Sequence, residues 1–332
     1  MAPIQLSSGD LIADRRAAYA RMLAGSGDPA AAADLQVQAL ELAPSWAAGW
    51  HELGNYREAA GDLEGAAEAW RKVLSLEPVD LFGAGLKLAL TGQATVPEAP
   101  PSEYVAQLFN DYSDRFDTAL VETLGYRVPE VLCDMIARAA GAEARFARAI
   151  DLGCGTGLFG ARIRAATSWL EGYDLSEGML SKAEAKGLYD RLGRADIRYG
   201  LPDGEATHAD LVAAADVFAY LGDLDPVFSL CARLVGEHGL LAFSLEAGPD
   251  GCDWRLRASL RYCHGEAYVR RLLEVNGFEI LEVRREPIRK DGEEAVIGLL
   301  VLARRTGADA PAEMTPAFPA SLDDETGEPA VN

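Results

Sequence analysis

Ala149–Gly157 reads AIDLGCGTG: an apolar stretch, a carboxylate, and then glycine at alternate positions. Glycine at such positions permits a tight turn and lets a ligand lie against the backbone. A helix is expected to begin near Leu158, so that its free N–H groups face the same turn. This order of strand, glycine turn and helix is typical of doubly wound α/β folds and predicts a nucleotide-like ligand at the turn.

The spacing of the glycines distinguishes two classes of ligand. A dinucleotide fingerprint requires a third glycine at the position that Leu158 occupies. Asp151 precedes the turn directly, where it would repel a pyrophosphate but could accept a hydrogen bond from an amino-acid ammonium. S-adenosylmethionine carries that ammonium and no phosphate. The pattern resembles motif I of class I S-adenosylmethionine-dependent methyltransferases, which implies S-adenosylmethionine as cofactor, bound by Asp151, Gly153, Gly155 and Gly157.

A second carboxylate supports this interpretation. Asp174 ends the next apolar stretch, 17 residues after Gly157, where doubly wound folds place an acid that binds ribose hydroxyls. A helix cap is the other common role of an acid at such a position. The resemblance further implies adenine contacts at the following residues: Leu175, Met179, Asp196 and Ile197.

The segment before the glycine turn carries a more specific resemblance. Tyr104–Leu132 is similar to the amino-terminal lid of a subfamily of small-molecule methyltransferases that includes the Williams–Beuren-region methyltransferase-like proteins, and GLYDRL at Gly187–Leu192 is a further match. In such enzymes the lid covers the donor. The resemblance therefore implies contacts to the donor from Tyr112, Tyr126 and Arg127.

Two later segments are candidates for the acceptor side. Asp216–Asp223 follows the fourth expected strand and is expected to form the rim between donor and acceptor, with Asp216 at the cofactor and Tyr220 as a wall; capping the next helix is an equally good role for Asp216. The connection Glu246–Glu266 gathers cations and aromatic residues in an otherwise acidic protein. There Arg261 could bind a carboxylate or phosphate, with His264 as general base, although each is also a common packing or surface residue.

The domain 103–305 alternates helical patterns with short apolar stretches, which predicts an α/β fold. We expect a seven-stranded, mostly parallel Rossmann-like methyltransferase sheet. The last two strands are joined through Lys290-Asp291-Gly292, a turn typical of a β-hairpin, so the last strand is expected to run antiparallel. The expected strands are Phe146–Asp151, Trp169–Asp174, one near Arg194–Ile197, Ala209–Asp216, Leu240–Leu245, Phe278–Arg285 and Ala295–Ala303.

The first 91 residues contain a repeat with a spacing of 34 residues, which relates Gly27 to Gly61 and Pro44 to Pro78. This register resembles the tetratricopeptide (TPR) repeat, so a small all-α domain of TPR-like repeats with a capping helix is expected over 1–91. Residues 92–102 are rich in proline and small residues and are expected to be a linker. Residues 306–332 hold acids, prolines and no basic residue, which predicts a disordered acidic tail.

Composition excludes several functions. The chain has 332 residues with 31 basic and 52 acidic side chains, a formal charge of −21, which disfavours binding of nucleic acid. It has no apolar run long enough to span a membrane and no signal-peptide pattern at its start, so no membrane partner and a cytoplasmic location are expected. The five cysteines are scattered without a C-x-x-C pair, so no metal site is expected.

The sequence therefore predicts a methyltransferase that acts by in-line methyl transfer on a small molecule or on a protein docked to the TPR-like repeats. Those repeats are expected to bind a protein partner or to mediate self-association. One alternative is a TPR interaction protein whose methyltransferase domain is vestigial. A second is an NAD-dependent oxidoreductase, which Leu158 and the terminal hairpin disfavour.

Overall fold

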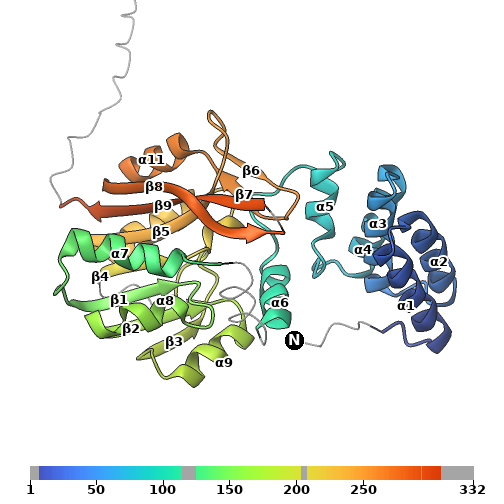
Figure 1. Ribbon diagram of the computed structural model, residues 1–332, viewed down its shortest axis with the longest axis horizontal. Coiled ribbons are helices and arrows are strands. Elements are labelled where there is room, and N and C mark those ends of the chain that lie inside the picture. The colour runs from blue at the N-terminus through green and yellow to red at the C-terminus, as the bar shows by residue number, and fades with distance from the viewer. Residues whose placement is uncertain (1–6, 114–124, 203–207, 293, 308–332) are drawn as a thin grey trace, which may run out of the picture.

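The computed structural model describes residues 7–113, 125–202, 208–292 and 294–307. Four helices at the N-terminal end form two antiparallel pairs, set apart from the rest of the chain (Figure 1). Their bounds are α1 Leu11–Gly25, α2 Pro29–Leu42, α3 Ala47–Ala59 and α4 Leu63–Leu76. Aspartates cap three of them, and Gly27 and Gly61 take equivalent positive φ angles of 86° and 83° between the paired helices. The tail expected over 306–332 lies outside the described residues from 308 on.

The small residues of the repeat let the helices approach one another. A Cβ atom added to Gly54 would lie 2.2 Å from Nε1 of Trp70, a side chain with no exposed surface. Trp46 is also buried, whereas Trp50 is partly buried and donates its indole N–H to the carbonyl of Pro44 at 2.9 Å. The tryptophans therefore belong to the core of the repeats, as in stacked helical repeats generally.

A fifth helix, α5 (Ala84–Leu90), joins the repeats to the next domain. Ala84 and Leu88 pack in the same cluster as Trp70, while Leu86 packs against Leu256 and Tyr262 of the second domain. The segment after α5 stays on that domain, because the Pro97 carbonyl accepts a hydrogen bond from the Tyr262 hydroxyl at 2.8 Å. The connection predicted as a linker thus contacts both parts, because Gln93 accepts a hydrogen bond from Arg71 of α4 at 2.6 Å while Pro97 lies against the second domain.

The second domain is an α/β sandwich built on one sheet (Figure 1). Five strands run parallel in the order β3-β2-β1-β4-β5. Beyond β5 comes β9, antiparallel to it, and then β8, so β9 is the one reversed strand of the seven expected ones. These seven are β1 Phe146–Leu152, β2 Thr167–Asp174, β3 Arg191–Arg194, β4 Ala209–Ala214, β5 Val235–Ala247, β8 Phe278–Asp291 and β9 Glu294–Arg305.

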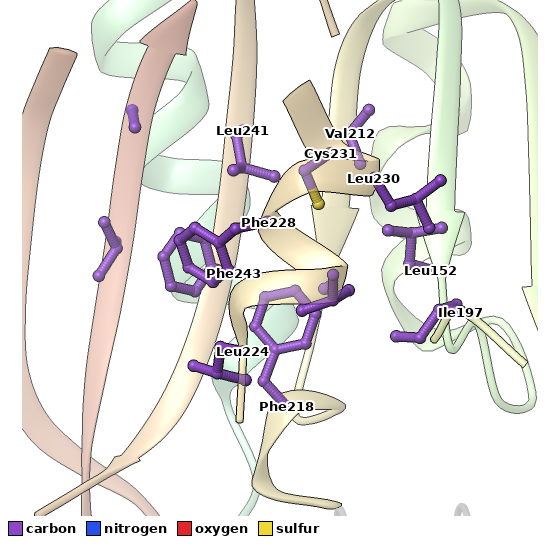
Figure 2. Close-up of a cluster of buried hydrophobic side chains, with 14 of the residues drawn as sticks. Leu152, Ile197, Val212, Phe218, Leu224, Phe228, Leu230, Cys231, Leu241 and Phe243 are labelled. Atoms are coloured by element: carbon purple, nitrogen blue, oxygen red, sulfur yellow. The ribbon is translucent and has the colours of Figure 1, made fainter. Parts of the chain in front are cut away.

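Alternate residues of the central strands face two different hydrophobic clusters. In β1 and β4, Ala149 and Leu211 pack on the side of α7 and α8, whereas their neighbours Ile150 and Val212 pack on the side of α10 and α11. In the second cluster Phe228 of α10 meets Phe243 of β5 edge to face, with ring centroids 5.3 Å apart (Figure 2). These helices are α7 Val128–Ala140, α8 Leu158–Ile163, α10 Asp225–Leu234 and α11 Glu266–Val275; α6 Ser102–Tyr112 and α9 Glu177–Lys186 complete the domain.

The seven-stranded sheet with its antiparallel last strand is confirmed, and two details were predicted wrongly. The third strand is Arg191–Arg194 and not Arg194–Ile197, because this short edge strand is marked by one leucine between arginines and a glycine. Two additional short strands, β6 Trp254–Leu256 and β7 Tyr262–His264, extend the sheet at the end of β5. Strands of three residues carry too little periodicity to be recognised in a sequence.

We expect the second domain to need helix α5 for its full stability but not to need the four helices of the repeats. Removing residues 1–77 keeps α5, whereas removing 1–90 uncovers Leu256 and Tyr262. The longer deletion should lower the free energy of unfolding by about 2 kcal/mol relative to the shorter one, since it removes the burial of one leucine and its neighbours. Both variants retain Trp169 and Trp254 as their only tryptophans, so urea unfolding followed by tryptophan fluorescence compares them directly. Equal midpoints would show that α5 belongs to the repeats alone.

Candidate functional site

The glycine turn after β1 adopts a backbone that only glycine takes readily. Gly153, Gly155 and Gly157 have φ angles of 64°, 53° and 89°. A Cβ atom on Gly153 would lie 2.4 Å from Cγ2 of Val217, which lies in the connection after the neighbouring strand β4. The backbone of the turn therefore packs against Val217 on one side and lines a cavity on the other.

Asp174 at the end of β2 fixes the turn. Its Oδ2 accepts a hydrogen bond from the Gly155 amide at 2.9 Å, and its Oδ1 accepts one from the Ser176 amide at 2.8 Å. Burial raises the pKa of this carboxyl, and the backbone hydrogen bonds oppose that rise. Asp174 thus joins two loops while remaining at the wall of the cavity.

Asp151 lies behind the turn. It is 1% exposed, it does not line the cavity, and its Oδ2 accepts a hydrogen bond from the Tyr189 hydroxyl at 2.7 Å. Burial raises its pKa to about 7. The ring of Tyr189 fills the space beside Gly157 and Gly160, where added Cβ atoms would lie 3.0 and 2.3 Å from it. Tyr189 therefore supports the turn from below, a role that its place in the sequence did not reveal.

A cavity of about 280 Å³ opens at the carboxyl ends of the parallel strands. The structure brings eleven of the sixteen predicted residues to its wall: Tyr112, Tyr126, Gly153, Gly155, Asp174, Leu175, Asp196, Ile197, Asp216, Tyr220 and Arg261. Residues far apart in the sequence thus form one site, as parallel-sheet topology requires.

The other predicted residues, apart from Asp151, lie elsewhere. Gly157 caps α8 beside Tyr189, and Met179 is fully buried in α9 away from the cavity wall. Arg127 is an exposed side chain paired with Glu130. His264 has no exposed surface, its Nε2 faces the Gly222 carbonyl at 3.1 Å, and burial lowers its pKa to about 4. Because it does not reach the cavity, the geometry does not support His264 as a general base.

Helix α6 covers the cavity and is fastened at both ends. Near its C-terminal end, the Asn110 side chain accepts hydrogen bonds from the Gly178 amide at 3.0 Å and the Ser176 hydroxyl at 2.7 Å. At its start, the Ser102 hydroxyl donates to Asp196 at 2.5 Å, and Arg198 holds the same carboxylate at 2.6 Å. Between these ends Val105, Leu108 and Phe109 form an apolar wall of the cavity, and Tyr112 lines it at the last residue of the helix.

A buried ion network forms the opposite wall. Arg289, which is 4% exposed, donates from Nη1 to both oxygens of Asp216 at 2.7 and 3.0 Å and from Nη2 to Glu246. Asp216 itself has a positive φ of 62°, and its backbone amide donates a hydrogen bond to the Ser244 hydroxyl oxygen at 2.8 Å. Sequence analysis missed Arg289, since it lies in a β8 strand of alternating charge with no signal that it turns inward.

Tyr220 and Arg261 lie together beside this network. Arg261 Nε donates to the Tyr220 hydroxyl at 3.0 Å, and the guanidinium carbon lies 5.5 Å from the centre of the Tyr220 ring. On its other side the Tyr220 ring meets Phe109 of α6 edge to face at 5.1 Å. Tyr220, the residue predicted as a wall of the acceptor side, is thus in contact with helix α6.

The sheet order, the reversed last strand and the glycine turn joined to an acid on β2 define the class I S-adenosylmethionine-dependent methyltransferase fold. Residues 150–241 match the family model described as a methyltransferase domain. The chain therefore contains a segment similar to methyltransferase domains, behind a TPR-like helical region. In the described part of the chain, no helix is long and apolar enough to cross a membrane.

Three curated relatives match different lengths of the chain. It is 40% identical over 89 residues to human methyltransferase-like protein 27, spanning 26% of this chain and 36% of that protein. It is 30% identical over 176 residues to a malonyl-[acyl-carrier protein] O-methyltransferase of Methylococcus capsulatus. That alignment covers 49% of this chain and 62% of the relative. A TPR repeat-containing protein of Pseudomonas aeruginosa is 44% identical to this chain over 50 residues. That alignment covers 15% of this chain and 48% of the relative. The chain thus spans about a third to three fifths of the length of these relatives.

The fold is also shared with a solved structure, that of the (4+2) cyclase SpnF. The TM-score is 0.51 at 18% identity over 63% of this chain and 98% of that one. This likeness concerns the fold, and the name of that protein shows that the fold is not restricted to methyl transfer.

We expect a side chain at Gly155 to abolish binding of the donor. Valine at a φ of 53° strains the turn, and its side chain fills space at the cavity wall. Titration calorimetry with S-adenosylhomocysteine should detect no binding to Gly155→Val. Gly187→Val is the matched control, because Gly187 has a φ of 61° with nothing within 4 Å of an added Cβ. Normal affinity in Gly155→Val would remove the turn from the site.

Replacing Asp174 by alanine should weaken S-adenosylhomocysteine binding by about 1–3 kcal/mol, because the variant loses a hydrogen-bond acceptor at the cavity and leaves the Gly155 amide without its partner. Asp190→Ala is the control, since Asp190 also accepts a backbone hydrogen bond, from Leu170 at 2.7 Å, but lies outside the cavity. The same calorimetric titration compares them. Equal affinities of the two variants would exclude Asp174 as a ligand of the donor.

Proposed function

We propose that the protein binds S-adenosylmethionine in this cavity and transfers its methyl group to an acceptor held against Tyr220 and Arg261. The observation that carries the proposal is the junction of the glycine turn with Asp174 at the carboxyl edge of the sheet, where the Gly155 amide and the Asp174 carboxylate meet at 2.9 Å. The acceptor is a small molecule or a group on a protein docked to the TPR-like region.

The residues of the cavity suit an adenosyl amino acid. Asp174 lies where it can accept hydrogen bonds from ribose hydroxyls, and Leu175 and Ile197 supply apolar surface for a purine, with Asp196 at its edge. A donor that carries a sulfonium and an ammonium is compatible with these carboxylates.

The chain's own contribution to the reaction is chiefly positioning. The donor supplies an already activated methyl group, so the acceptor has to be held in line with the methyl–sulfur bond at a distance of about 3 Å. Such positioning contributes about 7–11 kcal/mol, whereas a general base contributes a factor of about 10²–10⁴ in rate. Helix α6, fastened through Asn110 and Ser102, excludes water and fixes one wall of the site.

The curated relatives favour oxygen as the acceptor atom. The name of the Methylococcus capsulatus relative describes an O-methyltransferase, as does that of a ubiquinone biosynthesis O-methyltransferase that is 28% identical over 151 residues. We extend this to the present chain as part of the proposal. The NAD-dependent alternative is disfavoured by Leu158, which stands where a dinucleotide fingerprint has its third glycine, and by the antiparallel last strand β9.

We also propose that the TPR-like region docks a protein partner or a second copy of the chain. Helix α1 exposes Leu11, Ile12, Tyr19 and Met22, each more than half accessible, on the outer side of the stack. Repeats of this kind usually number three or more, so a stack of two pairs supports itself by further contacts. A cytoplasmic location is part of the proposal, and the five free cysteines agree with a reducing compartment.

Donor binding and transfer together test the proposed function. The full chain should bind S-adenosylmethionine in a calorimetric titration and move a tritiated methyl group into fractionated extract of a strain that lacks the protein. NADH is the control ligand and should give no heat of binding. Binding of NADH in place of the donor would favour an oxidoreductase, and failure to bind either would favour an interaction protein with a vestigial domain.

A further inference from the structure

Arg261 presents unused hydrogen-bond donors to the cavity. Its Nε is taken by the Tyr220 hydroxyl, while Glu246 Oε1 lies 3.9 Å from Nη1, beyond hydrogen-bond distance. None of the described residues accepts a hydrogen bond from either of its Nη groups. The side chain is 29% exposed and lines the cavity, so this edge of the guanidinium faces the space for an acceptor.

The charges around Arg261 do not balance. Asp216 and Glu246 are both held by Arg289, and Glu246 also receives Arg257 at 3.2 Å. Three arginines therefore face two carboxylates around Arg261, and of these five groups Arg261, Arg289 and Asp216 line the cavity. The Nε of Arg289 is buried and has no hydrogen-bond partner in the described part of the chain. In a protein with a formal charge of −21, this local excess of positive charge indicates an anionic ligand.

The same region offers no side chain suited to remove a proton. Among the described residues that line the cavity there is no histidine, lysine, cysteine or glutamate. Asp216 is ion-paired with Arg289, and burial raises the pKa of the Tyr126 and Tyr220 hydroxyls, so both are neutral near pH 7. An alcohol acceptor needs such a base, whereas a carboxylic acid, with a pKa of about 4, is ionised without one.

From these contacts we infer that the acceptor is a carboxylate, bound through the free edge of Arg261 and methylated on oxygen. This inference rests on the proposed function. One carboxylate oxygen stays on Arg261 while the other forms a bond to the methyl carbon, as the methyl–sulfur bond breaks and its electron pair remains on sulfur. The products are a neutral methyl ester and a neutral thioether, and no proton is transferred. The negative acceptor and the positive sulfonium cancel in the step, which a buried site favours.

The rest of the cavity specifies the body of the acid. Val105, Leu108 and Phe109 of α6 face the cavity, and Phe109 contacts the Tyr220 ring that Arg261 covers. A charged end at Arg261 is thus adjacent to apolar surface. We therefore expect an acid with an aliphatic or aromatic body and not a small, fully polar acid.

The test measures binding apart from turnover. The full chain is saturated with S-adenosylhomocysteine and titrated with octanoate, benzoate and 3-phenylpropanoate, each paired with its primary amide, and with octyl phosphate. At least one acid should bind at least about tenfold more tightly than its amide and more tightly than octyl phosphate. Arg261→Gln should remove that preference without changing affinity for the amide, and Arg261→Lys should restore part of it.

Arg255→Gln is the matched control, because Arg255 is an exposed residue of β6 on the same hairpin and does not line the cavity; it should leave all affinities unchanged. Transfer of a tritiated methyl group to the preferred acid should be independent of pH from about 6 to about 9, since the nucleophile is already ionised. The inference is overturned if no acid is preferred over its amide, if octyl phosphate binds more tightly, or if Arg261→Gln keeps the preference. Failure of S-adenosylhomocysteine to bind the wild-type chain would instead overturn the donor site and the proposed function.

Discussion

The hydrogen bond from the Gly155 amide to the Asp174 carboxylate is the contact on which the site depends. It joins the turn after β1 to the end of β2, and so connects two strands that are adjacent in the sheet. The Gly155 amide can point toward Asp174 because the glycines of the turn take positive φ angles. Without that junction, the floor of the cavity and the acid beside it would not hold a fixed relative position.

Packing beneath the turn is as specific as the contacts above it. Tyr189 fills the space that three glycines leave, Gly157, Gly160 and Gly172, and its hydroxyl reaches Asp151. A neutral tyrosine that donates to a buried carboxyl compensates part of the cost of taking that carboxyl out of water. Within the motif, Gly153 and Gly155 therefore leave space for the cavity, and Gly157 leaves space for the Tyr189 ring.

Charge is distributed unevenly across the cavity. The donor side is lined by Asp174 and Asp196, whereas Arg289 and Arg261 dominate the other side. A cationic donor and an anionic acceptor would each meet the opposite charge, and α6 contacts both sides through Asp196 and Tyr220. The single helix α6 thus contacts both sides of the cavity and fixes their relative position.

The sequence by itself determined the sheet and the place of the glycine turn beside Asp174, because the turn, the acid at the end of β2 and the Asp-Gly hairpin are local signals with a fixed geometric meaning. It also located the TPR-like repeats, whose spacing is visible in Gly27 and Gly61. The acceptor side was decided only by the tertiary structure. Arg289 turns inward, Arg261 keeps a free edge and His264 is buried, because strand register and the packing of the β6–β7 hairpin set these orientations. No local pattern encodes contacts between side chains from distant strands.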